Sequence, residues 1–169
     1  MQGIERIKKI RELNSNNPKW VNDDLYRLLI KEDTLVVAYE MMKSNAGNMT
    51  AGTDGSTFDG MSNDTIRQIS RSLADESFQF SPARRVEIPK DNGKTRSLGI
   101  ASPREKIVQF GMKLILEAIF EPTFSDNSHG FRASKGCHSA LKQVRKTWTG
   151  VWRGLLRGIS SPFSMRLTT

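Results

Sequence analysis

Two short strand-like segments on either side of a tight turn constrain this chain more than any other feature of its sequence. Residues 85–88 and 97–100 are strand-like, and the turn Asp91-Asn92-Gly93 lies between them. An Asn-Gly turn between such segments is a strong local signal for a β-hairpin. Ser102-Pro103 follows at once, and this pair suits the cap and first turn of a helix. The sequence therefore predicts a hairpin that leads directly into a helix.

The rest of the chain is predicted to be mostly helical, which gives an α+β fold with the hairpin packed on helices. Apolar residues recur at helical spacing over residues 4–13, 25–29, 35–42, 64–73, 107–120 and 137–148. The segment 107–120 is the most apolar, so we expect it to be the central core helix. Asp33 is expected to cap one helix, and Leu141 and Val144 are expected to face inward. Residues 45–60 are predicted to form a loop.

The basic residues are concentrated in the second half of the chain. Residues 84–169 contain 16 Lys and Arg against six Asp and Glu, whereas residues 1–83 contain ten against twelve. This asymmetry favours a polyanionic partner such as a nucleic acid for the second half. The alternative is a solvated basic surface that serves solubility.

Neither a cofactor nor a metal is predicted, and no membrane partner is expected. Cys137 is the single cysteine, so a disulfide framework is excluded. The spacing of His129 and His138 matches no zinc pattern, and we expect structural or RNA-contacting roles for both. No apolar run approaches the ~20 residues of a membrane span. The N-terminus has the features of neither a signal peptide nor a transit peptide.

The hairpin and the loop before it hold the candidate binding residues. Lys90, Lys94 and Arg96 cluster around the turn, where phosphates can approach. Alternatively, Lys and Arg protect an exposed strand edge against aggregation. Gly52, Asp54 and Gly55 form a glycine-rich loop, which by itself indicates only a turn.

Taken in order, several motifs resemble the N-terminal, fingers part of a group II intron-encoded reverse transcriptase/maturase, as found in mitochondrial genomes. They cover roughly residues 45–148 and include Gly52-Thr-Asp-Gly55, Arg84-Arg85-Val86, Ile88-Pro89-Lys90, Leu98-Gly99-Ile100 and Ser128-His-Gly-Phe-Arg132. The resemblance implies a fingers-like domain over 45–148, after a helical segment over 1–44 and before a divergent basic tail over 149–169.

The resemblance also assigns roles to residues. In this family the fingers hairpin binds the template and phosphates. The resemblance therefore implies that Lys90, Lys94 and Arg96 face phosphate. It also implies that Gly52, Asp54 and Gly55 shape a loop over the template. With the other cations of the basic half, the expected RNA-binding set is Arg84, Arg85, Lys90, Lys94, Arg96, Arg104, Lys106, Arg132, Lys135, Lys142, Arg145 and Lys146.

The chain departs from the family after its second fingers motif. The family continues into a palm with metal-binding aspartates, whereas no Asp or Glu follows Asp126 here. Because two-metal nucleotidyl transfer needs clustered carboxylates, we expect no polymerase activity. The leading hypothesis is a non-catalytic RNA-binding component of a mitochondrial ribonucleoprotein such as the ribosome, with other proteins as partners. The alternatives are an intron-RNA-binding splicing factor and a fragment of a split reverse transcriptase.

Overall fold

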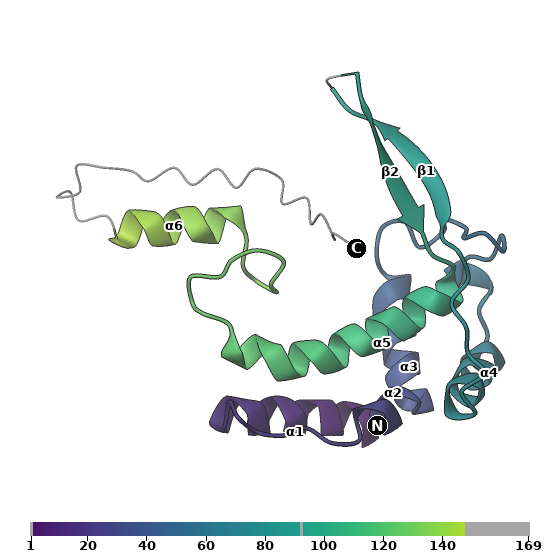
Figure 1. The fold of residues 1–169 in the computed structure, drawn as a ribbon, viewed down its shortest axis with the longest axis horizontal. Coiled ribbons are helices and arrows are strands. Elements are labelled where there is room, and N and C mark those ends of the chain that lie inside the picture. Colours follow the sequence, from purple (N-terminus) through teal and green to yellow (C-terminus); the bar gives the residue numbers. More distant parts are fainter. Residues whose placement is uncertain (1, 92, 148–169) are drawn as a thin grey trace, which may run out of the picture. The chain divides into compact units, whose positions relative to one another are not determined.

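The structure, a computed structural model, describes residues 2–91 and 93–147. The chain forms two compact units, Met1–Phe124 and Ser125–Thr169. The helices are α1 (Gln2–Asn16), α2 (Leu25–Leu29), α3 (Glu32–Lys43), α4 (Asn63–Ala74), α5 (Pro103–Phe120) and α6 (Cys137–Thr147). The remaining elements are two 3-10 turns, η1 (Phe58–Gly60) and η2 (Glu121–Thr123), and the strands β1 (Arg84–Pro89) and β2 (Thr95–Ile100). The mostly helical α+β class is thereby confirmed (Figure 1).

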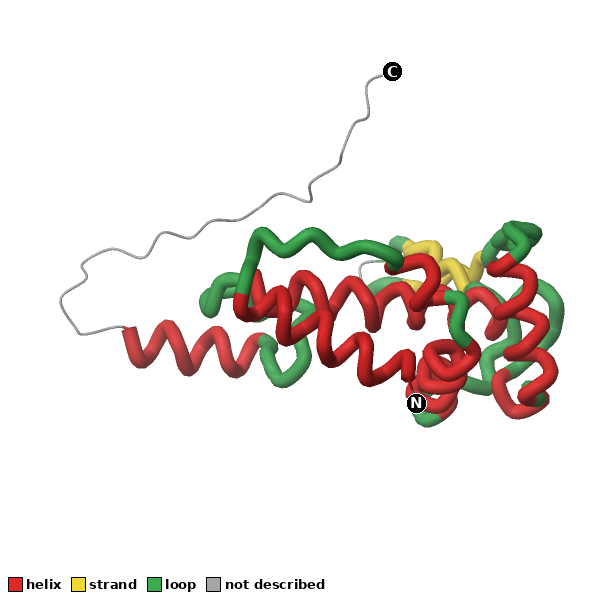
Figure 2. The backbone as a smooth tube through the Cα atoms, turned by 90° about the horizontal axis from the view of Figure 1, so that it is seen from below, coloured by secondary structure: helices red, strands yellow, loops and turns green. Residues whose placement is uncertain are grey.

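Helix α5 is the centre of the first unit, as its apolar sequence predicts. Ile107, Val108 and Ile115 are buried, and α5 packs against α1, α2 and α3. Figures 1 and 2 show α1 lying alongside α5. The other buried apolar residues of this core are Ile10, Leu28, Leu29, Leu35, Ala38, Tyr39, Phe58, Ile66, Ile69, Leu73 and Ala118. Burial of these side chains is the main force that holds the unit together.

Two helix starts differ in how far local sequence determines them. Ser62 caps α4, and its hydroxyl accepts a hydrogen bond from the Thr65 backbone N–H at 3.3 Å. The expected cap at Asp33 is wrong, because α3 begins earlier, with Lys31 at its N-cap position. The Asp33 carboxylate instead accepts a hydrogen bond from the backbone N–H of Gly3. The Asp33 side chain therefore bonds to a distant segment and does not cap its own helix.

The loop between α3 and α4 is anchored in the core, which its polar composition does not reveal. Phe58 is 1% exposed, and its ring stacks on Tyr39 with 6.1 Å between the ring centroids. The Tyr39 hydroxyl also donates a hydrogen bond to the carbonyl oxygen of Phe58 at 3.2 Å. The loop is therefore held at its C-terminal end, close to the start of α4.

Strands β1 and β2 form an antiparallel hairpin whose register pairs Arg84 with Ile100 and Pro89 with Thr95. Most of its side chains are exposed, and it projects away from the helices (Figure 1). The expected packing of the hairpin on helices is therefore limited to its base. A projecting hairpin leaves both of its faces open to a partner.

In the second unit, the described residues 125–147 form a loop followed by α6. Leu141 and Val144 were expected to face inward, but their exposed fractions are 65% and 51%. Within this described part of the unit, α6 has no second helix or strand against which to bury them. Trp148 and the tail lie outside the described residues. No described helix is long and apolar enough to cross a membrane.

Candidate nucleic-acid interface

The cations of the hairpin lie on different faces of it. Directly paired residues share a face of a two-stranded sheet, so the register places Arg84 and Arg96 on the face of the half-buried Val86 and Ile88. Arg85 lies on the opposite face with Glu87, which accepts a hydrogen bond from the Ser97 hydroxyl. A polyanion could therefore contact the hairpin from either side.

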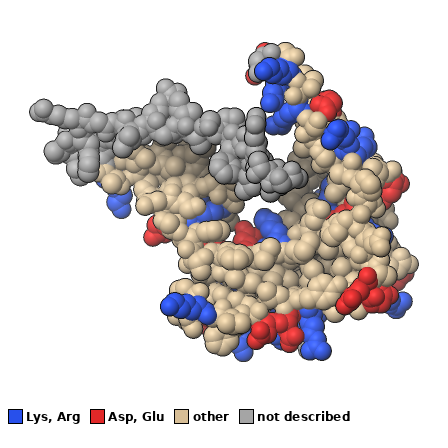
Figure 3. Space-filling model, viewed as in Figure 1, with Lys and Arg blue, Asp and Glu red and all other residues tan. Residues whose placement is uncertain are grey.

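The tip of the hairpin adds two lysines. The backbone N–H of Lys90 donates to the carbonyl oxygen of Lys94 at 2.7 Å, and that of Gly93 donates to Lys90 at 3.0 Å. Gly93 has a φ of 73°, a left-handed conformation that glycine adopts without strain. A cleft of about 430 Å³ below the tip is lined by Ile88, Pro89, Lys90, Asp91 and Arg96. Figure 3 shows Lys and Arg atoms gathered along the projecting hairpin.

At the base of the hairpin, the carboxylate of Glu105 in α5 holds the segments that precede β1 and follow β2. One of its oxygens accepts the backbone N–H of Ser81 at 2.8 Å, and the other accepts that of Ser102 at 2.9 Å. Glu105 is only 3% exposed. A buried carboxylate is stable when it accepts such hydrogen bonds, so this residue fixes where the hairpin leaves the helices.

The loop that holds Gly52, Asp54 and Gly55 reaches the same junction. A Cβ atom at Gly52 would lie 2.5 Å from the Cα atom of Ser102, so the two backbones touch closely. The Thr53 hydroxyl donates to the carbonyl oxygen of Pro82 at 3.3 Å. Gly55 has a φ of 72°. The structure thus brings the loop and the hairpin base together at the start of α5.

Asp54 is used within its own loop. The Ser56 hydroxyl donates to its carboxylate at 2.7 Å, and the Ser56 backbone N–H donates to it at 3.1 Å. The hydrogen bond from the Ser56 side chain is the main cause that lowers the pKa of Asp54 below its usual value. Asp54 is therefore ionised at neutral pH and stabilises the turn.

Two cations in the first turn of α5 lie over aromatic rings. The guanidinium carbon of Arg104 is 4.4 Å from the ring centroid of Phe78, and Nζ of Lys106 is 5.7 Å from that of Phe58. Arg104 is exposed and Lys106 is half-buried. Such contacts restrain the positions of both cations near the hairpin base.

The second unit carries the remaining predicted cations. The Arg132 guanidinium donates to the carbonyl oxygens of Ser125 and Ser128, each at 2.8 Å. Lys135 forms an ion pair with Asp126 at 3.7 Å. These two side chains hold the loop of the unit, whereas Lys142, Arg145 and Lys146 are exposed on α6. Spacings of three and four residues place those three on one helix face.

The histidines differ in their surroundings. His129 hydrogen-bonds through Nδ1 to the Ser139 hydroxyl at 2.8 Å and through Nε2 to the Gln143 side chain at 2.7 Å. His129 therefore links the loop of the second unit to α6, while His138 is exposed. In the described part of the chain, no group of three or more His, Cys, Asp or Glu could hold a metal ion.

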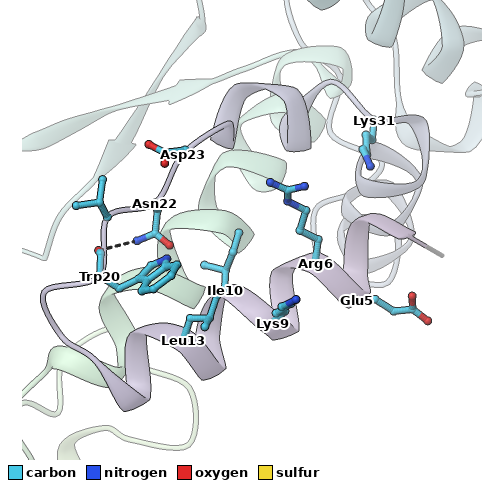
Figure 4. Close-up of a pocket in the computed structure, with 10 residues that line it drawn as sticks. Glu5, Arg6, Lys9, Ile10, Leu13, Trp20, Asn22, Asp23 and Lys31 are labelled. Carbon is cyan, nitrogen blue, oxygen red and sulfur yellow. Dashed lines mark hydrogen bonds between the residues drawn. The ribbon is translucent and has the colours of Figure 1, made fainter.

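A different kind of cleft, of about 600 Å³, lies beside α1 (Figure 4). Ile10, Leu13 and Trp20 contribute apolar surface to it, while its charged lining residues have both signs. The charged residues are Glu5, Arg6, Lys9, Asp23 and Lys31. This mixture contrasts with the hairpin, whose charged side chains are mostly basic.

The sequence analysis assigned no role to Glu105 or Phe78, which position the junction. The spacing Ser102-x-x-Glu105 is a capping-box signature, so the sequence contained a signal for the bond between Glu105 and the Ser102 backbone. The second bond, from Ser81, joins positions 24 residues apart, and no local pattern predicts it. The ring of Phe78 under Arg104 is likewise a tertiary contact.

Comparison with known proteins identifies the family. An uncharacterized 91 kDa protein in the cob intron of Schizosaccharomyces pombe is 42% identical over 149 residues, or 87% of the chain and 18% of that protein. The group II intron-encoded protein LtrA of Lactococcus lactis is 40% identical over 148 residues, or 87% and 24%. The mitochondrial protein nuclear intron maturase 4 of Arabidopsis thaliana is 28% identical over 139 residues, or 82% and 16%. No family model matches the sequence.

These similarities place the chain among intron proteins. More narrowly, the chain belongs to the group II intron-encoded protein family, as its motifs indicate. The chain spans between 16% and 24% of the length of these relatives.

Proposed function

We propose that the chain binds RNA through the hairpin, the loop over 52–56 and the start of α5. The observation that carries this proposal is the projecting hairpin, which has five Lys or Arg against two Asp or Glu over residues 84–100. Cations on both faces and at the tip can neutralise several phosphates at once. The buried Glu105 gives this basic hairpin a fixed base.

Intron RNA is the partner that we propose, in place of the ribosomal RNA that the sequence analysis put first. The names of the three relatives mention introns, and that of the Arabidopsis thaliana protein a maturase. We further propose that residues 45–148 form a fingers-like module and that the protein acts in mitochondria. The mitochondrial Arabidopsis thaliana relative supports this location.

The test is a triple variant, Lys90→Ala, Lys94→Ala and Arg96→Ala, of the full chain. We expect weaker binding to a group II intron RNA and a shallower dependence of log affinity on log salt. Three lost phosphate contacts would reduce the magnitude of that slope by about 2. Filter binding over a series of salt concentrations measures both quantities.

The matched control removes three exposed lysines elsewhere: Lys8→Ala, Lys19→Ala and Lys43→Ala. It changes the net charge equally, so it separates a local interface from general attraction. Equal losses in the two triple variants would contradict the proposed interface. A wild-type chain that binds no RNA would overturn the proposed function itself.

A further inference from the structure

A small pocket lies between α4 and the first turn of α5, beside the base of the hairpin. Its volume is about 240 Å³, and its lining residues are Thr65, Gln68, Ile69, Ser72 and Arg104. The four residues from α4 stand at positions i, i+3, i+4 and i+7 and therefore share one helix face. The pocket is too small for a typical drug-sized ligand, whose sites begin at about 300 Å³, and it suits a single planar group.

Arg104 gives this pocket a flat cationic wall. Its guanidinium lies over the Phe78 ring at 4.4 Å, and Phe78 meets Phe80 edge to face with 5.2 Å between ring centroids. The backbone N–H of Phe78 donates to the carbonyl oxygen of Ser72 at 2.9 Å, which ties this aromatic pair to α4. The Phe78 ring therefore restrains the guanidinium beside the pocket.

Two polar side chains of the pocket have no hydrogen-bond partner among the described residues. In the part of the chain that the structure describes, neither the Gln68 amide nor the Arg104 guanidinium is hydrogen-bonded to protein. By contrast, the Thr65 hydroxyl lies 3.2 Å from that of Ser62, and the Ser72 hydroxyl donates to Ile69. An amide can both donate and accept, which matches the edge of a nucleobase.

We infer that this pocket holds one unpaired RNA base, stacked on the Arg104 guanidinium and hydrogen-bonded along its edge by the Gln68 amide. Unpaired bases bind proteins by stacking on aromatic rings or Arg planes and by pairing through their edges. Arg104 follows β2 by only four residues, so a strand bound along the hairpin can place a base here. The inference rests on the proposed RNA binding and adds single-strand recognition to it.

The test compares two substitutions in the full chain. Arg104→Lys keeps the charge but removes the plane, and Gln68→Ala removes the amide from an exposed position. The probes are a labelled single-stranded RNA of about ten nucleotides and a duplex of the same sequence. Fluorescence anisotropy gives the affinity for each probe. Arg71→Lys and Gln109→Ala are the matched controls, because both residues are exposed and lie outside the pocket.

We expect Arg104→Lys to weaken single-strand binding by about tenfold, because a stacked base is lost. Gln68→Ala should also weaken it, and the duplex binding of this variant should change little, because duplex bases are already stacked and paired. Arg104→Lys should leave the salt dependence unchanged, since no cation is removed.

Two results would overturn the base-binding role of the pocket and leave the proposed function standing. One is an equal loss of affinity for both probes, and the other is a variant that binds like its control while the wild type binds. No binding of either probe by the wild type would overturn both. Thermal unfolding of each variant identifies an affinity loss that comes from misfolding. If Arg104→Lys misfolds, the result for the exposed Gln68→Ala variant alone tests the pocket.

Discussion

At the scale of single residues, two glycines shape the loop before α4 in different ways. Gly52 lies against the backbone of Ser102, and Gly55 has a φ of 72°. The first position has no room for a side chain, and the second has a conformation that costs other residues roughly 1 kcal/mol or more. Gly52 therefore permits the close approach to Ser102, and Gly55 permits the left-handed turn that follows it.

We expect Gly52→Ala to destabilise the first unit by about 1–3 kcal/mol, the usual cost of forcing an added group into packed surroundings. The new Cβ atom would meet the Ser102 backbone at 2.5 Å, and a backbone cannot rotate away as a flexible side chain can. Denaturant unfolding measures the change. The control is Gly60→Ala, where a Cβ atom would meet nothing within 4 Å. Similar losses in the two variants would contradict the close-contact explanation.

At the scale of elements, the junction of hairpin, loop and α5 positions the candidate interface. Glu105 holds the backbone on both sides of the hairpin, while Thr53 contacts the segment that leads into β1. The strands themselves have little support beyond this base, because most of their side chains are exposed. The direction in which the hairpin projects therefore depends on a few hydrogen bonds near the start of α5.

We expect Glu105→Gln to loosen this junction. An amide keeps one acceptor oxygen but places an NH₂ group against the other backbone N–H, and a buried donor without an acceptor costs about 1–3 kcal/mol. Hydrogen exchange should then become faster at the Ser81 and Ser102 amides, and RNA affinity should fall. The control is Glu117→Gln, which removes only an ion pair with Lys113 at 3.8 Å on the surface of α5. Unchanged exchange at Ser81 would show that Glu105 does not fix the hairpin.

Sequence-based prediction succeeds for contacts within an element or at its ends and misses contacts between distant elements. The Asn-Gly turn and the Ser-Pro pair predict the hairpin and the start of α5, because turn and cap chemistry act within a few residues. The burial of Phe58 and the position of Asp33 depend on contacts between distant segments, so local patterns miss them. The candidate cations were visible in the sequence, whereas the bond from Ser81 to Glu105 and the Phe78 ring under Arg104 are tertiary contacts that no local pattern predicts.

At the scale of the whole molecule, charge alone would attract any RNA. The basic half contributes phosphate contacts that carry no sequence information, so such contacts cannot select an intron over another RNA. Selection would have to come from the shape of the RNA or from its unpaired bases. The hairpin supplies affinity in this scheme, while the pocket beside Arg104 supplies a contact that only some RNAs can make.

We therefore expect the full chain to prefer a group II intron RNA over a ribosomal RNA fragment of equal length by about tenfold at physiological salt, near 0.15 M. Competition of unlabelled RNAs against a labelled intron RNA measures this ratio. The hairpin triple variant should weaken binding to both RNAs alike, because phosphate contacts are shared, and so should leave the ratio unchanged. A ratio near one would mean that only general electrostatic attraction operates. Stronger competition by the ribosomal RNA would instead favour the ribonucleoprotein role that the sequence analysis put first.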